Sequence, residues 1–98
     1  MNIQAMMKQA QKLQADMMSE KSKIDAKEFE GKSSLVTITM TGKREVTKVD
    51  IQLDEFDKDE KEMLEDMIML AINDALKKID KETEDKMGKY TQGLPGLF

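Results

Sequence analysis

Residues 64–79, LEDMIMLAINDALKKI, decide the fold of this 98-residue chain. Apolar side chains recur through them at spacings of three and four residues, which is typical of an amphipathic helix. The recurrent positions are Leu64, Ile68, Ala71, Ala75 and Ile79, broadened by Met67, Ile72 and Leu76. Residues 67–70 place apolar side chains around the whole circumference of such a helix, so this turn has to be covered on every side. The stretch therefore predicts a long helix that packs against more than one neighbour.

Polar residues mark both ends of this helix. Asp57 is suited to cap its beginning, with Glu60 three residues later as the reciprocal partner. After Ile79 the sequence is almost wholly polar, so we expect the helix to project into solvent and to stop near Gly88. Residues 88–98 contain glycine and proline and are expected to form a loose C-terminal tail.

A small antiparallel sheet of three strands is predicted before the long helix. The strands are expected at residues 26–31, 35–41 and 46–53, with a hairpin loop at residues 42–45. Alternating apolar residues should place one face of the sheet inward. That face is expected to carry Val36, Ile38, Met40, Val49, Ile51 and Leu53. A sheet this small needs a helix on its apolar face to be stable.

Residues 2–23 are predicted to form a second long helix, at the N-terminus. Its apolar positions follow the seven-residue repeat of a helix that packs along another helix, as in a coiled coil. They are Ile3, Met6, Ala10, Leu13, Met17 and Ile24. Lys8 and Lys12 lie four residues apart on the opposite side, where they form either a solvated face or a phosphate-contacting one.

The composition favours a homodimer. Ten methionines supply much of the apolar mass and aromatic residues only 4%, so the chain gains from burying further surface against a partner. The expected dimer interface is Leu64, Met67, Ile68, Met69, Ala71, Ile72 and Ala75. The predicted class is an α+β fold: one domain of residues 1–98, paired in an intertwined homodimer with protruding helices.

The chain lacks the residues that most catalytic and metal sites require. It has no cysteine and no histidine, so disulfides, thiolate chemistry and imidazole ligands are excluded. The acids near Asp54 do not have the spacing of a calcium-binding loop. No stretch resembles a signal peptide or reaches the ~20 apolar residues of a membrane span. We expect a cytoplasmic protein that is not an enzyme and has no cofactor, metal, small-molecule substrate or membrane partner.

The order of several blocks resembles a known family. Residues 6–14 (MMKQAQKLQ), the hairpin at 35–53, residues 62–66 (EMLED) and 71–75 (AINDA), and the ending at 87–98 are similar to the YbaB/EbfC nucleoid-associated proteins. The resemblance implies a homodimer with a small α+β body and paired protruding helices. It also implies binding to duplex DNA, a change in DNA conformation, and roles in nucleoid organisation and regulation of gene expression.

The charges place the expected DNA contacts on the first helix and on the far end of the second. The net charge is −4, but residues 1–50 hold nine basic and seven acidic groups, whereas residues 51–98 hold seven and thirteen. The lysines expected to contact phosphate are Lys8, Lys12, Lys21 and Lys23, followed by Lys81, Lys86 and Lys89. Asn2 and the glutamines of the first helix are candidates to reach base edges. The alternative is a protein-interaction module that binds a helical or basic replication or repair partner.

Overall fold

The computed structural model describes residues 2–91, and they contain the predicted helix, sheet and helix. The elements are α1 (Ile3–Ala26), β1 (Glu28–Ser33), β2 (Val36–Thr41), β3 (Val46–Ile51), a short 3₁₀ helix η1 (Lys58–Glu60) and α2 (Lys61–Thr91). The three strands form one antiparallel sheet in the order β1-β2-β3. The predicted α+β class is therefore confirmed.

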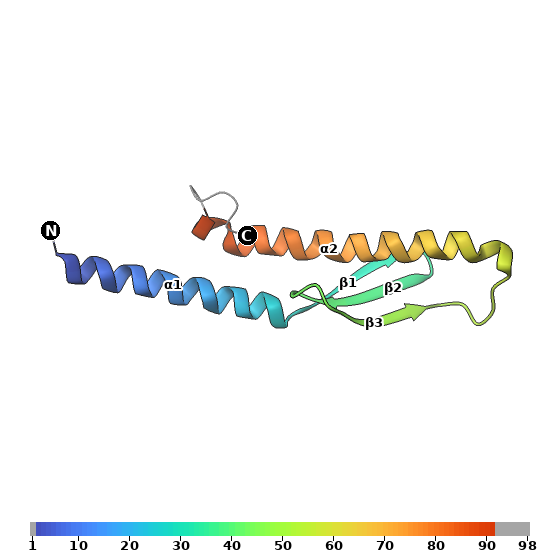
Figure 1. Ribbon diagram of the computed structural model, residues 1–98, viewed down its shortest axis with the longest axis horizontal. Coiled ribbons are helices and arrows are strands. Elements are labelled where there is room, and N and C mark those ends of the chain that lie inside the picture. Colours follow the sequence, from blue (N-terminus) through green and yellow to red (C-terminus); the bar gives the residue numbers. More distant parts are fainter. Residues whose placement is uncertain (1, 92–98) are drawn as a thin grey trace.

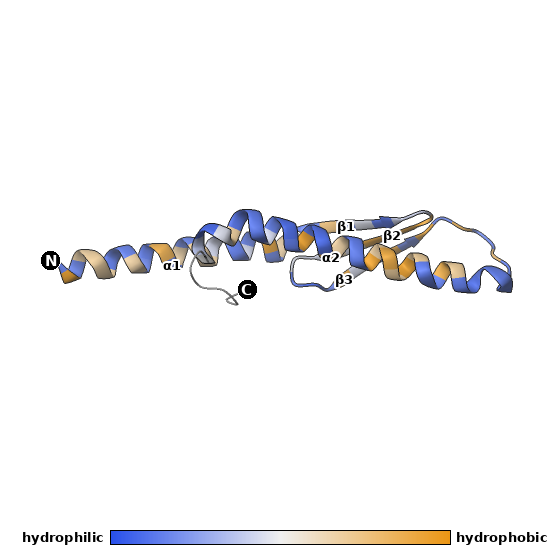
Figure 2. Ribbon diagram, turned by 90° about the horizontal axis from the view of Figure 1, so that it is seen from above, coloured by the Kyte–Doolittle hydropathy of each residue, from blue (hydrophilic) through white to orange (hydrophobic). Residues whose placement is uncertain are grey.

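The molecule is long and thin. Its extents are 72 × 22 × 14 Å, and both helices run along the longest axis (Figure 1). The helix α2 begins near one end of the sheet and lies along one of its faces, whereas α1 extends away from the other end of the sheet (Figure 1). Figure 2 shows that α2 is hydrophobic where it lies over the sheet and mostly hydrophilic toward its C-terminal end.

The core lies between α2 and the first two strands. Val36, Ile38 and Met40 are buried, as their alternation predicts, and face the buried side of α2. The helix approaches very closely at Gly31 on β1, where an added Cβ would lie 1.9 Å from the Ala71 carbonyl oxygen. Glycine on the strand and small residues on the helix thus let the two backbones touch.

The apolar face of β3 is not covered by α2, although the alternation of its sequence predicts that this face is buried. Val49 pairs with Ile38 and so faces the same side of the sheet, yet it is 52% exposed. The reason is that α2 lies over β1 and β2 and leaves the face of β3 open (Figure 1). Leu53 lies beyond the end of the strand at Ile51. The expectation that Val49 is buried is therefore wrong for the single chain.

Two side chains of α2 hold the outer edge of β1. The Asp74 carboxylate accepts the backbone N–H of Lys32 at 3.0 Å. The Lys78 ammonium donates to the carbonyl oxygen of Glu30 at 2.7 Å and lies 3.4 Å from Asp74. These contacts occupy backbone groups that an edge strand otherwise offers to another chain. The hydrogen bond from Lys32, and then the charge of Lys78, hold the pKa of Asp74 below its ordinary value.

This arrangement predicts a pH-dependent contribution to stability. A free aspartate has a pKa of about 3.9, so Asp74 stabilises the fold fully above that pH and loses its effect as pH falls through its lower folded pKa. We expect Asp74→Asn to cost less than about 1 kcal/mol at pH 7, since the pair is partly exposed. Urea unfolding at pH 7 and pH 3 measures this. A cost that is undiminished at pH 3 contradicts the assignment.

Both ends of α2 differ from the sequence prediction. Asp57 precedes the short helix η1, but its side chain makes no capping bond. The Glu60 N–H donates instead to the Asp57 carbonyl at 2.9 Å, so the predicted capping box does not form. The helix also continues through Gly88 to Thr91 rather than stopping near Gly88. The rest of the expected tail, residues 92–98, lies outside the described residues.

The second half of α2 does not simply project into solvent. Met87, 1% exposed, joins Ile79 and Ile24 in the buried core, which ties α2 to the end of α1. Met87 lies eight residues after Ile79 and extends its apolar stripe, but charged neighbours hide this in the sequence. The prediction that the helix projects into solvent after Ile79 is therefore wrong for the segment up to Met87.

The helix α1 is capped and mostly uncovered. Asn2 accepts the backbone N–H of Ala5 at 3.2 Å, so its side-chain oxygen caps the helix. Ile24 is buried, but Ile3 and Leu13 are 69% and 57% exposed. Within residues 2–91, the predicted packing of the apolar stripe along another helix is thus limited to its base. We call residues 3–20 of α1 the arm.

Candidate nucleic-acid interface

The outer half of the arm carries two cations and no acids. Lys8 and Lys12 are exposed, and the first carboxylate in the sequence is that of Asp16. Among residues 2–91, neither lysine forms an ion pair. Both ammonium groups are therefore available to an external phosphate, the kind of contact that dominates duplex binding.

The lysines nearer the base of α1 are partly neutralised. The Lys21 ammonium lies 3.3 Å from the Asp25 carboxylate, and that of Lys23 lies 3.9 Å from Glu20. Both pairs are exposed enough for solvent to weaken them. A phosphate has to compete with these carboxylates, so each lysine is a weaker contact than Lys8 or Lys12.

The lysines of α2 lie in mixed electrostatic surroundings. Lys81, Lys86 and Lys89 are exposed on the C-terminal half of the helix, and the Lys89 ammonium lies 5.0 Å from the centre of the Tyr90 ring. Lys86 shares a surface groove with Lys23 of α1. The same groove contains Glu20 and Glu82, which lower its positive potential.

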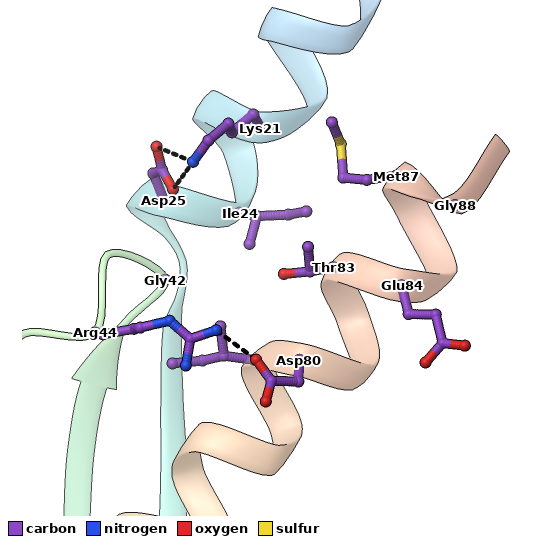
Figure 3. A pocket seen from close by; sticks show the side chains of 11 residues that line it. Lys21, Ile24, Asp25, Gly42, Arg44, Asp80, Thr83, Glu84, Met87 and Gly88 are labelled. Carbon is purple, nitrogen blue, oxygen red and sulfur yellow. Dashed lines mark hydrogen bonds and ion pairs between the residues drawn. The ribbon is translucent and has the colours of Figure 1, made fainter. Parts of the chain in front are cut away.

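A pocket of about 620 Å³ lies where α1, α2 and the β2–β3 hairpin meet (Figure 3). Ile24, Ile79 and Met87 form its apolar part. Its charged lining consists of the cations Lys21 and Arg44 and the carboxylates Asp25, Asp80 and Glu84. Lys21 bonds Asp25 and Arg44 bonds Asp80 in the pocket (Figure 3). Three carboxylates and two cations do not make a phosphate site.

Sequence reasoning did not include two basic residues near this junction. Arg44 lies on the hairpin and reaches Asp80 of α2, and Lys27 follows α1 and lies 2.5 Å from Glu82. Each pair joins segments more than 35 residues apart in the chain. The only sequence signal was a basic pair at a turn, Lys43 and Arg44, which does not reveal the partner.

The residues predicted for a dimer interface fall into three groups. Leu64, Ala71 and Ala75 are at most 9% exposed and pack against the chain's own sheet, so they leave no surface for a partner. Met67, Ile68 and Ile72 are partly buried, and Met69 is 53% exposed. The surface of α2 that remains accessible to a second subunit therefore lies on the flanks of this helix.

These features define a small α+β protein that projects a lysine-bearing helix from a sheet-and-helix body. The chain belongs to the YbaB/EbfC DNA-binding family, whose model matches residues 1–94. The family resemblance of the sequence and its DNA-binding class are thus confirmed, and the family is one of DNA-binding proteins rather than of enzymes. Neither helix of the described part has the length and apolar character needed to cross a membrane.

Bacterial relatives match nearly the whole chain. It is 42% identical to a nucleoid-associated protein of Ligilactobacillus salivarius, across 99% of this chain and 95% of that protein. It is 46% identical to one of Enterococcus faecalis, across 98% and 94%. It is also 48% identical to one of Lactococcus lactis, across 97% and 98%.

Proposed function

We propose that this chain forms a homodimer that binds duplex DNA through its arms, constrains the path of the DNA on the nucleoid and catalyses no reaction. The observation that carries the proposal is the outer half of the arm, where Lys8 and Lys12 face solvent with no carboxylate before Asp16. The DNA-binding family and the nucleoid-associated relatives support the same ligand. A cytoplasmic location follows from this proposal.

The contacts with DNA are proposed to be mainly to phosphates. Lysines contribute charge without the fixed fork of arginine, and phosphate contacts do not discriminate between sequences. Two arms held by one body would grip the duplex at two places, so their separation would bend or constrain the intervening DNA. This supports a role in organising DNA and, through its shape, in regulating gene expression.

The face of β3 that α2 leaves uncovered is the proposed dimer interface. Asp74 and Lys78 mark the flank of α2 that faces β1, and at 100° per residue Met69, Ile72 and Leu76 lie on the other flank, toward β3. These three residues of α2 and the residues Val49 and Ile51 of β3 form two adjoining apolar surfaces, which we call the apolar corner. A second copy related by a two-fold axis would fill both corners with the same surface.

A charge in this corner tests the interface. We expect Val49→Glu to raise the dimer dissociation constant at least about a hundredfold, because it would bury an unpaired carboxylate. Sedimentation velocity over a concentration series measures the change. Met18→Glu is the matched control, since Met18 is 61% exposed on the arm, outside the corner. A Val49→Glu chain that dimerises like the parent contradicts this interface.

Duplex binding is tested directly by a gel shift. The chain should retard a random-sequence duplex more strongly than either of its single strands, because single-strand binding relies on aromatic stacking and aromatic residues make up only 4% of the chain. Equal or stronger retardation of the single strands contradicts the proposed ligand.

A further inference from the structure

We propose that Gly42 and the Lys27–Glu82 ion pair set the direction in which the arm leaves the body, and that this direction determines the affinity for duplex DNA. The second half of this inference rests on the proposed function, since it concerns the aim of Lys8 and Lys12. These three residues act on the arm from its base, so they are positioning residues and need not touch DNA.

The close contact at Gly42 fixes one side of the base of α1. Gly42 lies where the hairpin meets the last turn of α1 (Figure 3). An added Cβ would lie 1.9 Å from the carbonyl oxygen of Ile24 and 2.9 Å from the Cα of Asp25. Backbone atoms cannot rotate away as a flexible side chain can. Only glycine therefore permits the observed approach of the hairpin to α1.

Polar contacts fix the other sides of the base. Lys27 is the single residue between α1 and β1, and its carbonyl accepts the N–H of Gly42 at 3.0 Å. Its ammonium lies 2.5 Å from the carboxylate of Glu82 on α2. The side chain of Lys27 is 54% exposed and that of Glu82 is 22% exposed. The base of the arm is thus held between the hairpin and α2, while the arm itself is largely uncovered.

The length of α1 magnifies any movement at this base. An added Cβ at Gly42 requires a displacement of about 1 Å to bring the contact to Ile24 from 1.9 Å to the 3.0 Å limit for a Cβ. Over one helical turn of ~5.4 Å this tilts the helix by about 10° and moves its far end by about 5 Å. Such a movement changes the spacing of the lysines on the two arms, so they no longer match the same phosphates.

Distances between spin labels test the direction of the arm. The chain has no cysteine, so Ala15→Cys on the arm and Lys77→Cys on α2 provide two unique sites. Dilution of the labelled chain with excess unlabelled chain isolates the distance within one subunit. We expect Gly42→Ala to shift this distance and to lower duplex affinity at least about fivefold, with helicity and dimerisation kept. Gly88→Ala is the matched control, because its Cβ would meet nothing within 4 Å among residues 2–91.

A second substitution keeps the test decisive if Gly42→Ala fails to fold. Glu82→Gln removes the charge facing Lys27 without adding volume, and it should broaden the distance distribution. It should also weaken duplex binding, although the loss of a carboxylate from the groove of Lys23 and Lys86 would strengthen binding by charge alone. Unchanged distances in the folded variants overturn the inference. Altered distances with unchanged duplex affinity overturn its second half and leave the proposed function standing. If the unsubstituted chain binds no duplex, the proposed function fails, and the second half of the inference fails with it.

Discussion

Replacing Gly31 with alanine is expected to lower the free energy of unfolding by about 3 kcal/mol, the upper end of the usual cost of overpacking a core. The added Cβ would lie 1.9 Å from the carbonyl oxygen of Ala71 and 2.4 Å from the amide nitrogen of Ala75. Both atoms belong to the backbone of α2, so the helix has to move off the sheet to relieve the contact. Urea unfolding followed by circular dichroism measures the loss.

A matched glycine substitution separates this clash from a general effect of alanine. Gly88 lies inside α2, and in the described part of the chain nothing is within 4 Å of an added Cβ. Gly88→Ala should therefore stabilise the helix by roughly 0.5–1 kcal/mol, the usual helical preference for alanine. If Gly31→Ala and Gly88→Ala have the same effect, the close packing of α2 on β1 does not limit stability.

Reversing the charge of Lys8 and Lys12 together is expected to reduce duplex affinity more than any other change on the arm. Each lysine that neutralises one phosphate contributes about 0.9 to the slope of log affinity against log salt, so losing two from each arm of the dimer lowers the slope by about 4. The two glutamates also repel the phosphates, so at low salt the affinity should fall by at least about a hundredfold. Fluorescence anisotropy of a labelled duplex at several salt concentrations measures both quantities.

The control for this variant uses lysines that are already paired. Lys21 and Lys23 lie beside Asp25 and Glu20, so Lys21→Gln and Lys23→Gln should reduce affinity much less than the reversal at Lys8 and Lys12. Both pairs of variants should retain the parental dimer and thermal transition, because all four lysines are exposed. An unaltered affinity after reversal at Lys8 and Lys12 removes these two residues from the interface.

Local patterns in the sequence were sufficient to predict the elements of this fold. The alternation of Val36, Ile38 and Met40 predicts the central strand and its buried face, and the repeat from Leu64 to Ile79 predicts the buried side of α2. Both patterns reflect which residues face the core, and that information is local. The lateral position of α2 is not local. It depends on Gly31 meeting Ala71 and Ala75, which leaves Val49 uncovered.

The candidate interface was predictable only in part. Lys8 and Lys12 are exposed as expected, because their position opposite the apolar stripe follows from helix geometry. The neutralisation of Lys23 by Glu20 was within reach of the sequence, since the two lie three residues apart. The ion pair between Lys27 and Glu82 could not be predicted from the sequence, because a contact across 55 residues depends on the completed fold.

The most direct test is the affinity of the unsubstituted chain for a random-sequence duplex, measured by anisotropy as salt is increased. We predict saturable binding by a dimer at low salt, and a linear decrease of log affinity with log salt whose slope indicates several phosphate contacts. A chain that remains a monomer and leaves the duplex unbound even in dilute buffer contradicts the account.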